Sequence, residues 1–197
     1  MKKFLGDSGK YGLEYLEAKE LREYTDDDII KLTNAFSTEL ISPSVPWILF
    51  ERENINKLLK VAKCRKCGRC CLPDKTSPDN PGVIVGENDL IGISQHTKHS
   101  LKSLRKIVKV NDDPRYNIGA IYLPLPCMFF NKNERSCKIY AHRPFICRIY
   151  PISDDSDGEN ITIDVHCEYG KEMFQKALKY LREEDRKAHG LTMKEKG

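Results

Sequence analysis

The chain of 197 residues has no long apolar segment. No window approaches the roughly 18 consecutive apolar residues that a membrane-spanning helix requires. The lysines at positions 2 and 3 are not followed by the apolar stretch of roughly 7–15 residues that a secretory signal peptide contains. Apolar residues make up 40% and charged residues 31%, with a mean hydropathy of -0.55, so the core has little apolar material to spare. We therefore expect a cytoplasmic protein that does not enter a membrane.

The sequence also lacks the common catalytic signatures. It has no nucleophile elbow, no phosphate-binding loop and no HExxH helix, and it contains neither an internal repeat nor a low-complexity tract. The formal net charge of +4 is ordinary for this length, so nucleic acid is not an expected partner. These features do not decide whether the chain is an enzyme. The expected partner is an unidentified redox or interaction protein.

Eight cysteines dominate what is present, and four of them lie within residues 64–71, the CxxCxxCC segment. Two residues between cysteines let both sulfurs face one centre, as in zinc and iron–sulfur sites. Gly68 suits a tight ligand loop, because it lacks a Cβ. A reducing cytosol opposes disulfides, although the cytosol of hyperthermophiles is an exception. We therefore expect metal ligands, with thiol–disulfide chemistry as an open alternative. The four cysteines are Cys64, Cys67, Cys70 and Cys71.

The other four cysteines are far apart in the sequence, so only the fold can bring them together. The total of eight fits two four-thiolate sites, or one site with spare cysteines. Because adjacent side chains tend to diverge, we expect Cys70 and Cys71 to point in different directions and to serve different centres if both bind metal. The remote cysteines are Cys127, Cys137, Cys147 and Cys167.

The arrangement of the cysteines favours iron–sulfur over zinc. Structural zinc usually takes its ligands as two separated CxxC pairs, whereas here a CxxCxxC run is completed by single remote cysteines. Cations next to the run would stabilise the negative charge of a four-thiolate cluster, although they would also stabilise metal-free thiolates. We expect an iron–sulfur cluster, of the 4Fe–4S type, with zinc as the alternative. The neighbouring cations are Lys60, Lys63, Arg65, Lys66 and Arg69.

Periodicity and breakers predict a small, helix-rich α+β single domain that is irregular around the metal site. Residues 1–59 would form a helical extension, 60–170 the cysteine-cluster metal-binding domain, and 171–197 a closing helix and tail. Within the extension, residues 1–24 are charged and are expected to be a peripheral helix or partly disordered. Helices are expected after Thr25, which can cap the first of them, and at 47–60, 89–95, 100–108 and from 168; strands are expected at 83–85 and 161–165.

Apolar side chains at helical spacing mark the buried faces of two of these helices. The first helix carries Ile29, Leu32, Phe36 and Leu40 on one side, and the closing helix carries Met173, Phe174, Ala177, Leu178 and Leu181. We interpret both faces as core packing and not as part of a cofactor site.

A second motif surrounds the remote cysteines. Cys127 precedes an aromatic pair, and the stretch 137–151, Cys-Lys-Ile-Tyr-Ala-His-Arg-Pro-Phe-Ile-Cys-Arg-Ile-Tyr-Pro, follows. Together with the CxxCxxCC segment, this stretch resembles a cysteine-cluster family of zinc- or iron-chelating domains over about residues 60–170. All eight cysteines match the family pattern, with Cys167 in the terminal place.

The resemblance implies cluster binding more firmly than any reaction. Many members are labelled iron–sulfur oxidoreductases, and a flagellin lysine N-methylase also carries the module. This chain lacks both a GxGxG methyl-donor loop and the CxxxCxxC spacing of radical enzymes. We therefore expect an electron-transfer or redox-accessory protein. The alternatives are a zinc-stabilised interaction module and a protein lysine methylase or its partner.

Polar residues of the motif complete the expected site. Arg143 and Arg148 are expected either to donate hydrogen bonds to cluster sulfurs or backbone carbonyls, or to form ordinary salt bridges. His142 and His166 lie beside the predicted ligands, and either could replace a thiolate. Tyr140 is expected to shield the site with its hydroxyl near solvent, as is the tyrosine at position 150.

Overall fold

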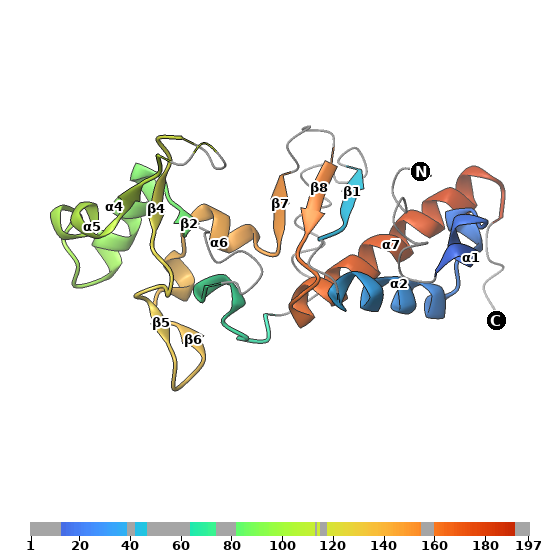
Figure 1. Cartoon of the computed structure of the whole chain (residues 1–197), viewed down its shortest axis with the longest axis horizontal. Coiled ribbons are helices and arrows are strands. Elements are labelled where there is room, and N and C mark those ends of the chain that lie inside the picture. The colour runs from blue at the N-terminus through green and yellow to red at the C-terminus, as the bar shows by residue number, and fades with distance from the viewer. Residues whose placement is uncertain are drawn as a thin grey trace. The chain divides into compact units, whose positions relative to one another are not determined.

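The computed structural model describes residues 13–38, 42–46, 64–73, 82–112, 114, 118–154 and 160–191. Helices and short antiparallel strands alternate along the chain, so the α+β class is confirmed (Figure 1). The chain divides into two compact units: the terminal unit, residues 1–65 and 151–197, and the central unit, residues 66–150. Among the described helices, none is long and apolar enough to cross a membrane. The helix expected at 47–60 and the side chain of Leu40 lie outside the described residues.

The terminal unit combines two long helices with a three-stranded antiparallel sheet. The strands follow the order β1-β8-β7, in which Val45 lies opposite Ile161 and Ser153 opposite Thr162. The strand predicted at 161–165 is confirmed as β8. The elements are α1 (Glu14–Glu17), η3 (Leu21–Glu23), α2 (Asp26–Thr38), β1 (Ser44–Pro46), β7 (Ile152–Asp154), β8 (Asn160–Ile163) and α7 (Glu168–Ala188).

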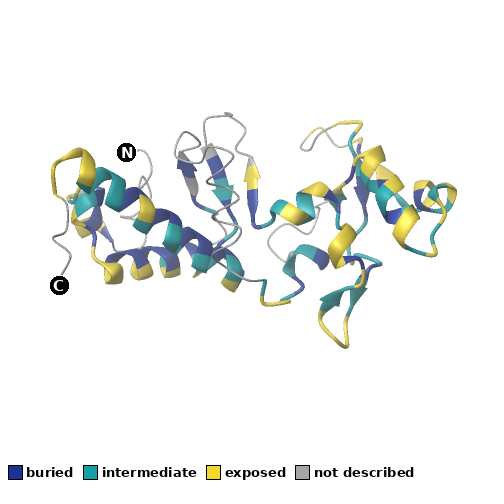
Figure 2. Ribbon diagram, turned by 180° about the vertical axis from the view of Figure 1, so that it is seen from behind, coloured by how far each residue is buried: buried dark blue, intermediate teal, exposed yellow. Residues whose placement is uncertain are grey.

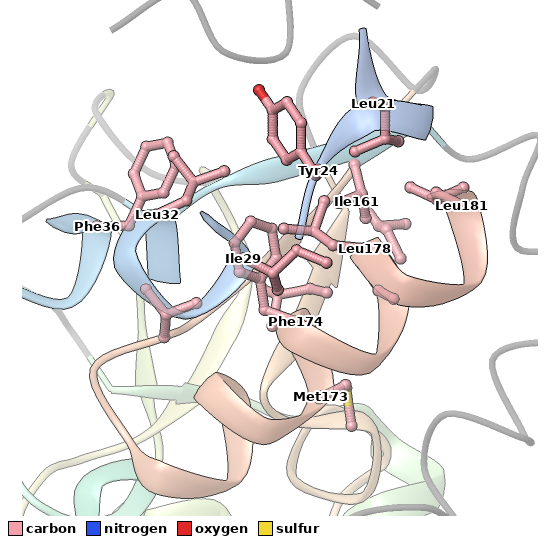
Figure 3. Close-up of a cluster of buried hydrophobic side chains, with 14 of the residues drawn as sticks. Leu21, Tyr24, Ile29, Leu32, Phe36, Ile161, Met173, Phe174, Leu178 and Leu181 are labelled. Carbon is pink, nitrogen blue, oxygen red and sulfur yellow. The ribbon is translucent and has the colours of Figure 1, made fainter. Parts of the chain in front are cut away.

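Helices α2 and α7 pack face to face around the core of this unit (Figures 2 and 3). The rings of Phe36 and Phe174 meet edge to face, 6.1 Å between centroids. Asp26, at the start of α2, receives hydrogen bonds from Lys179 at 2.6 Å and Arg182 at 2.8 Å on α7. All five apolar residues predicted for the closing helix are buried, which confirms that face.

The start of α2 was predicted correctly. The Asp28 N–H donates to Thr25 Oγ1 at 3.1 Å, and the Thr25 N–H donates back to Asp28 Oδ2 at 2.9 Å. This reciprocal pair satisfies backbone donors that the first helical turn leaves without partners. Ile29, Leu32 and Phe36 are buried as expected.

The described part of the N-terminal segment is core and not periphery, which corrects the expectation for residues 13–24. Leu16 and Tyr24 are fully buried, and Leu21 is nearly so. The Tyr24 hydroxyl donates to the Leu16 carbonyl at 3.0 Å, and Arg182 donates to the Tyr24 carbonyl at 3.1 Å. The high charge of this segment concealed four apolar residues of the buried cluster, Leu13, Leu16, Leu21 and Tyr24.

The central unit is built from short elements. One sheet has the order β2-β4-β3, and β5 with β6 forms a separate hairpin. The predicted helices at 89–95 and 100–108 and the strand at 83–85 are confirmed with small shifts of their ends. The elements are η5 (Arg69–Cys71), β2 (Val83–Ile84), α4 (Glu87–His96), α5 (Leu101–Ile107), β3 (Lys109–Val110), β4 (Ile121–Leu123), β5 (Phe130–Asn131), β6 (Ser136–Cys137), η6 (Tyr140–His142) and α6 (Phe145–Ile149).

The two units differ in the size of their apolar cores. Among the described residues, the terminal unit has 17 side chains in its buried cluster, whereas the central unit has seven. The central unit contains six of the eight cysteines, so the unit richest in thiols is also the one with the smaller core. The seven residues are Val85, Leu90, Ile93, Leu104, Leu123, Phe129 and Ile139.

Candidate metal centre

The CxxCxxCC segment ends in a tight turn that requires a glycine. Gly68 has φ +80, in the left-handed region, and the Cys71 N–H donates to its carbonyl at 2.9 Å. A Cβ at this position would lie 2.5 Å from the Phe130 ring. The turn and the aromatic ring therefore both exclude a side chain here, as the sequence indicated for the turn.

A hairpin carries the next two cysteines. Cys127 precedes β5, and Cys137 in β6 pairs with Phe130 across the hairpin. The Phe130 N–H donates to the Cys127 carbonyl at 2.9 Å. At the other end, Asn131 Oδ1 accepts the N–H groups of Asn133 at 3.1 Å and Glu134 at 3.4 Å, which closes the turn. The hairpin thus returns the chain so that both cysteines lie at its open end.

Cys147 lies on α6, and one carboxylate fixes the start of that helix. Asp89 Oδ1 accepts the Phe145 N–H at 3.0 Å, while Asp89 Oδ2 accepts the Gly86 N–H at 2.9 Å. The same side chain therefore serves the first turns of both α4 and α6. In the neighbouring η6, His142 stacks on His96 of α4 with centroids 3.4 Å apart and planes 12° apart. Two contacts thus hold the motif around Cys147 against α4.

These elements bring five thiols together in the central unit. The Cys70 and Cys71 sulfurs are 3.8 Å apart, and Cys71 also hydrogen-bonds through its side chain to Cys127. Cys137 and Cys147 lie close enough to sense the charge of Cys70 and Cys127. The expectation that Cys70 and Cys71 point in different directions is wrong, because their sulfurs lie 3.8 Å apart within η5.

The pKa values of two of the five thiols are lowered. A hydrogen bond from Cys71 lowers the pKa of Cys70 against the opposing effect of burial, and Arg143 lowers it further. The pKa of Cys127 falls to about 7, first because Cys71 donates a hydrogen bond and then because the N–H groups of Phe129 and Phe130 point at its sulfur. Such N–H donors stabilise the charged form directly.

The other three thiols are held in the protonated form. Cys71 has a strongly raised pKa, because it gives hydrogen bonds to Cys127 and Cys70 and is buried. Burial raises the pKa of Cys137, and it raises the pKa of Cys147 to about 12 with the help of the neighbouring thiolates. The ionisation of one of these thiols opposes the ionisation of its neighbours, because the negative charges repel each other.

Arg143 supplies a positive charge at this site. Its guanidinium favours the thiolate forms of Cys70, Cys137 and Cys147. The side chain is fixed by a 3.0 Å hydrogen bond from Nε to the Tyr140 carbonyl and by stacking on the Tyr140 ring, with Cζ 3.9 Å from the centroid. Of the alternatives raised by the sequence, the hydrogen bond to a backbone carbonyl is the one present.

The other polar residues of the motif take different positions. Arg148 is exposed, with Cζ 5.9 Å from the centroid of Phe145. Tyr140 exposes 52% of its surface, in keeping with a ring at the edge of the site. In the terminal unit, His166 Nδ1 lies 2.9 Å from Asp164 Oδ1, so this imidazole is oriented by a carboxylate.

The remaining predicted ligands lie at the ends of the motif. In the central unit, Cys67 precedes the turn, and Arg135 donates to its carbonyl at 3.1 Å. Cys64 and Cys167 belong to the terminal unit. Cys167 is 4% exposed and is the N-cap of α7, where its sulfur accepts the Gly170 N–H at 3.3 Å. Their assignment as ligands stays a prediction.

The donor set of the central unit fits a thiophilic metal. Thiolates bind zinc, iron and iron–sulfur clusters, and the site already holds N–H donors that reduce the charge on a ligand sulfur. Within the described ranges, no group of three or more cysteine, histidine, aspartate or glutamate side chains is arranged to hold a metal ion.

Comparison with known proteins gives one match. A sequence profile of the CxxCxxCC family, described as "Putative zinc- or iron-chelating domain", matches residues 63–168, which is more than half of the chain. The comparison with curated proteins and the comparison with solved structures each returned no match. The matched residues include all eight cysteines and Arg143, so the chain belongs to the CxxCxxCC family of zinc- or iron-chelating domains.

Proposed function

We propose that the central unit binds iron through cysteine thiolates as an iron–sulfur cluster, and that the protein transfers electrons or assists a redox enzyme. The observation that carries this proposal is the grouping of five thiols with one fixed guanidinium. Such a cluster, when bound, supplies a one-electron redox centre. The chain's own part is to orient the sulfurs, donate N–H groups to them and offset their charge. The five candidate ligands are Cys70, Cys71, Cys127, Cys137 and Cys147.

The number of thiols is sufficient for a complete four-thiolate centre. A tetrahedral zinc ion or a 4Fe–4S cluster takes four protein thiolates. The five thiols exceed that number, and Cys67 is a sixth cysteine in the same unit. We expect four iron atoms per chain, with the remaining cysteines as spare or second-centre ligands.

A zinc-stabilised interaction module is the second candidate, and the small core of the central unit favours it. Seven buried apolar side chains among the described residues provide a limited hydrophobic driving force for a unit of this length. Zinc sites in small domains supply folding free energy directly. In this case the metal would supply stability that the small apolar core does not, and the protein would act by binding a partner through its surface.

Metal and acid-labile sulfide analysis of protein purified without oxygen tests both candidates. Iron with equimolar sulfide and a broad visible charge-transfer band supports the cluster. Colourless protein with stoichiometric zinc would refute the electron-transfer role and leave the zinc-stabilised module. Cys127→Ser is the informative variant, because its sulfur accepts two backbone N–H groups and Ser keeps the hairpin geometry. Lys132→Ser, an exposed change in the same hairpin, is the matched control.

A further inference from the structure

Two aromatic side chains stand exposed on the segment that carries Cys147. Tyr140 exposes 52% of its surface, and Phe145 exposes 59%. An arginine lies over each ring: Arg143 with Cζ 3.9 Å from the Tyr140 centroid, and Arg148 with Cζ 5.9 Å from the Phe145 centroid. These four residues form what we call the aromatic–arginine patch. Both the apolar rings and the positive guanidinium groups are therefore available to a partner.

The patch is held in place by contacts beneath it. Arg143 Nε donates to the Tyr140 carbonyl at 3.0 Å, and the Phe145 N–H donates to Asp89 Oδ1 at 3.0 Å. The stacking of His142 on His96 adds a further contact between this segment and α4. A surface fixed in advance loses little conformational entropy when a partner binds.

The charge of the chain is divided unevenly between its units. Residues 66–150 contain 14 lysines and arginines against seven aspartates and glutamates, a net charge of +7. The terminal unit contains 19 against 22, a net charge of -3. The overall value of +4 therefore conceals a strongly positive central unit. Such a field attracts an acidic partner and speeds its association at low salt.

The patch also adjoins the thiols. Cys147 lies between Phe145 and Arg148 in the sequence of α6, and Arg143 acts on the pKa values of Cys70 and Cys147. A molecule bound to the patch is therefore next to the proposed metal centre. The guanidinium groups of Arg143 and Arg148 make this same surface favourable for negatively charged groups.

We propose that the aromatic–arginine patch is a docking surface for an acidic protein whose carboxylates are flanked by apolar side chains. Carboxylates pair well with the planar fork of arginine, and the apolar groups cover the Phe145 ring. Tyrosine and arginine are also the residue types that most often dominate binding energy at protein interfaces. The inference rests on the proposed function, since it names the partner of the same site.

Exposed aromatics with arginines can also bind single-stranded nucleic acid, but the geometry here favours protein. Base stacking needs open ring faces. Arg143 already covers one face of Tyr140 at 3.9 Å, and its Nε is engaged by the Tyr140 carbonyl. A carboxylate can still reach the remaining guanidinium N–H groups of this arginine.

Fluorescence anisotropy with a short labelled peptide of alternating glutamate and leucine tests the proposal. The protein is used as isolated, full length, with its metal content measured in every sample. We expect salt-dependent binding that Phe145→Ala and Arg148→Glu each weaken by about tenfold. Both residues are exposed, so circular dichroism and metal content should match the parent protein.

Lys102→Glu is the matched control, because it makes the same charge change as Arg148→Glu at an exposed site on α5. Figure 1 shows α5 away from α6 within the central unit. We expect this control to weaken binding by less than about twofold. Three results would overturn the proposal: no peptide binding, equal losses in Lys102→Glu and Arg148→Glu, or tighter binding of labelled oligothymidylate that depends on Phe145. The binding result stands whichever metal is found, so it is separable from a failure of the iron assignment.

Discussion

The Cys127 N–H donates a 2.7 Å hydrogen bond to the carbonyl oxygen of Cys71. This bond joins the CxxCxxCC segment to the segment of remote cysteines through the backbone. A backbone contact therefore positions Cys71 next to Cys127. One hydrogen bond contributes only about 1 kcal/mol, however, so it cannot hold the central unit together alone.

Removal of the metal should therefore loosen the central unit and spare the terminal unit. The described core of the terminal unit has 17 buried side chains against seven in the central unit. On the proposed function, metal-binding free energy would supplement the smaller core. After chelation we expect amide hydrogen exchange to accelerate in α4, β4 and α6, while α2 and α7 keep their protection. Unchanged protection in the central unit would show that its fold does not depend on metal.

Arg143 should govern the affinity of the site for metal. The guanidinium favours the thiolate forms of Cys70, Cys137 and Cys147, so Arg143→Gln raises their pKa values. We expect about a 10- to 100-fold loss in metal affinity, the usual effect of removing a group that supports metal ligands. Competition with a chromogenic chelator measures the loss.

Two further variants separate the roles of this arginine. Arg143→Lys keeps the charge but loses the guanidinium fork that bonds the Tyr140 carbonyl and stacks on its ring, so an intermediate affinity is expected. Arg148→Gln removes a cation from the exposed part of the same motif and should leave affinity nearly unchanged. Equal effects of Arg148→Gln and Arg143→Gln would mean that only the overall charge of the unit matters.

Two glycines of the central unit should respond in opposite ways to alanine. Gly68→Ala is expected to destabilise the unit by about 2 kcal/mol, because the left-handed φ of +80 is unfavourable for alanine and the Cβ would collide with Phe130. Gly92→Ala, in α4, has nothing within 4 Å of its Cβ and should stabilise by about 0.5–1 kcal/mol. Urea unfolding followed by tyrosine fluorescence compares them. If both changes destabilised the protein, the central unit would be sensitive to any added side chain, and the effect of Gly68→Ala would not be specific to its turn.

The sequence predicted the elements whose signals are local. Helix α2 was found because Thr25 and Asp28 form its cap within one turn, and α7 because its apolar residues repeat at helical spacing. Strand β1 was not predicted, because it is only three residues long and contains Pro46, which does not favour a strand. Its pairing with β8 is a long-range contact on a sheet edge, where proline is tolerated.

The site was predictable in its composition but not in its arrangement. Spacing identified the cysteines, yet the contact of Cys71 with Cys127 joins residues far apart in the chain and exists only in the folded unit. Asp89 was not singled out, because an acidic residue at a helix start is ordinary. Its second hydrogen bond, to Phe145, exists only in the folded unit and leaves no sequence signal.

Asp28 should make the terminal unit sensitive to acid. Burial opposes its ionisation, but hydrogen bonds from the Thr25 N–H and from Lys19 hold the pKa below its ordinary value. A depressed pKa contributes stability above the unfolded pKa of about 4, and that contribution is lost as the pH falls toward the folded pKa. Asp28→Asn should therefore cost about 1 kcal/mol at neutral pH and progressively less below about pH 4.

Thermal unfolding followed by circular dichroism between about pH 3 and pH 7 measures this difference, because most of the helical signal of the terminal unit comes from α2 and α7. Asp27→Asn is the control: Asp27 is exposed in the same first turn and should change stability by less than about 0.5 kcal/mol. If the cost of Asp28→Asn stayed constant down to about pH 3, the side chain would act through packing and capping geometry, and the ionised carboxylate would not be the source of stability.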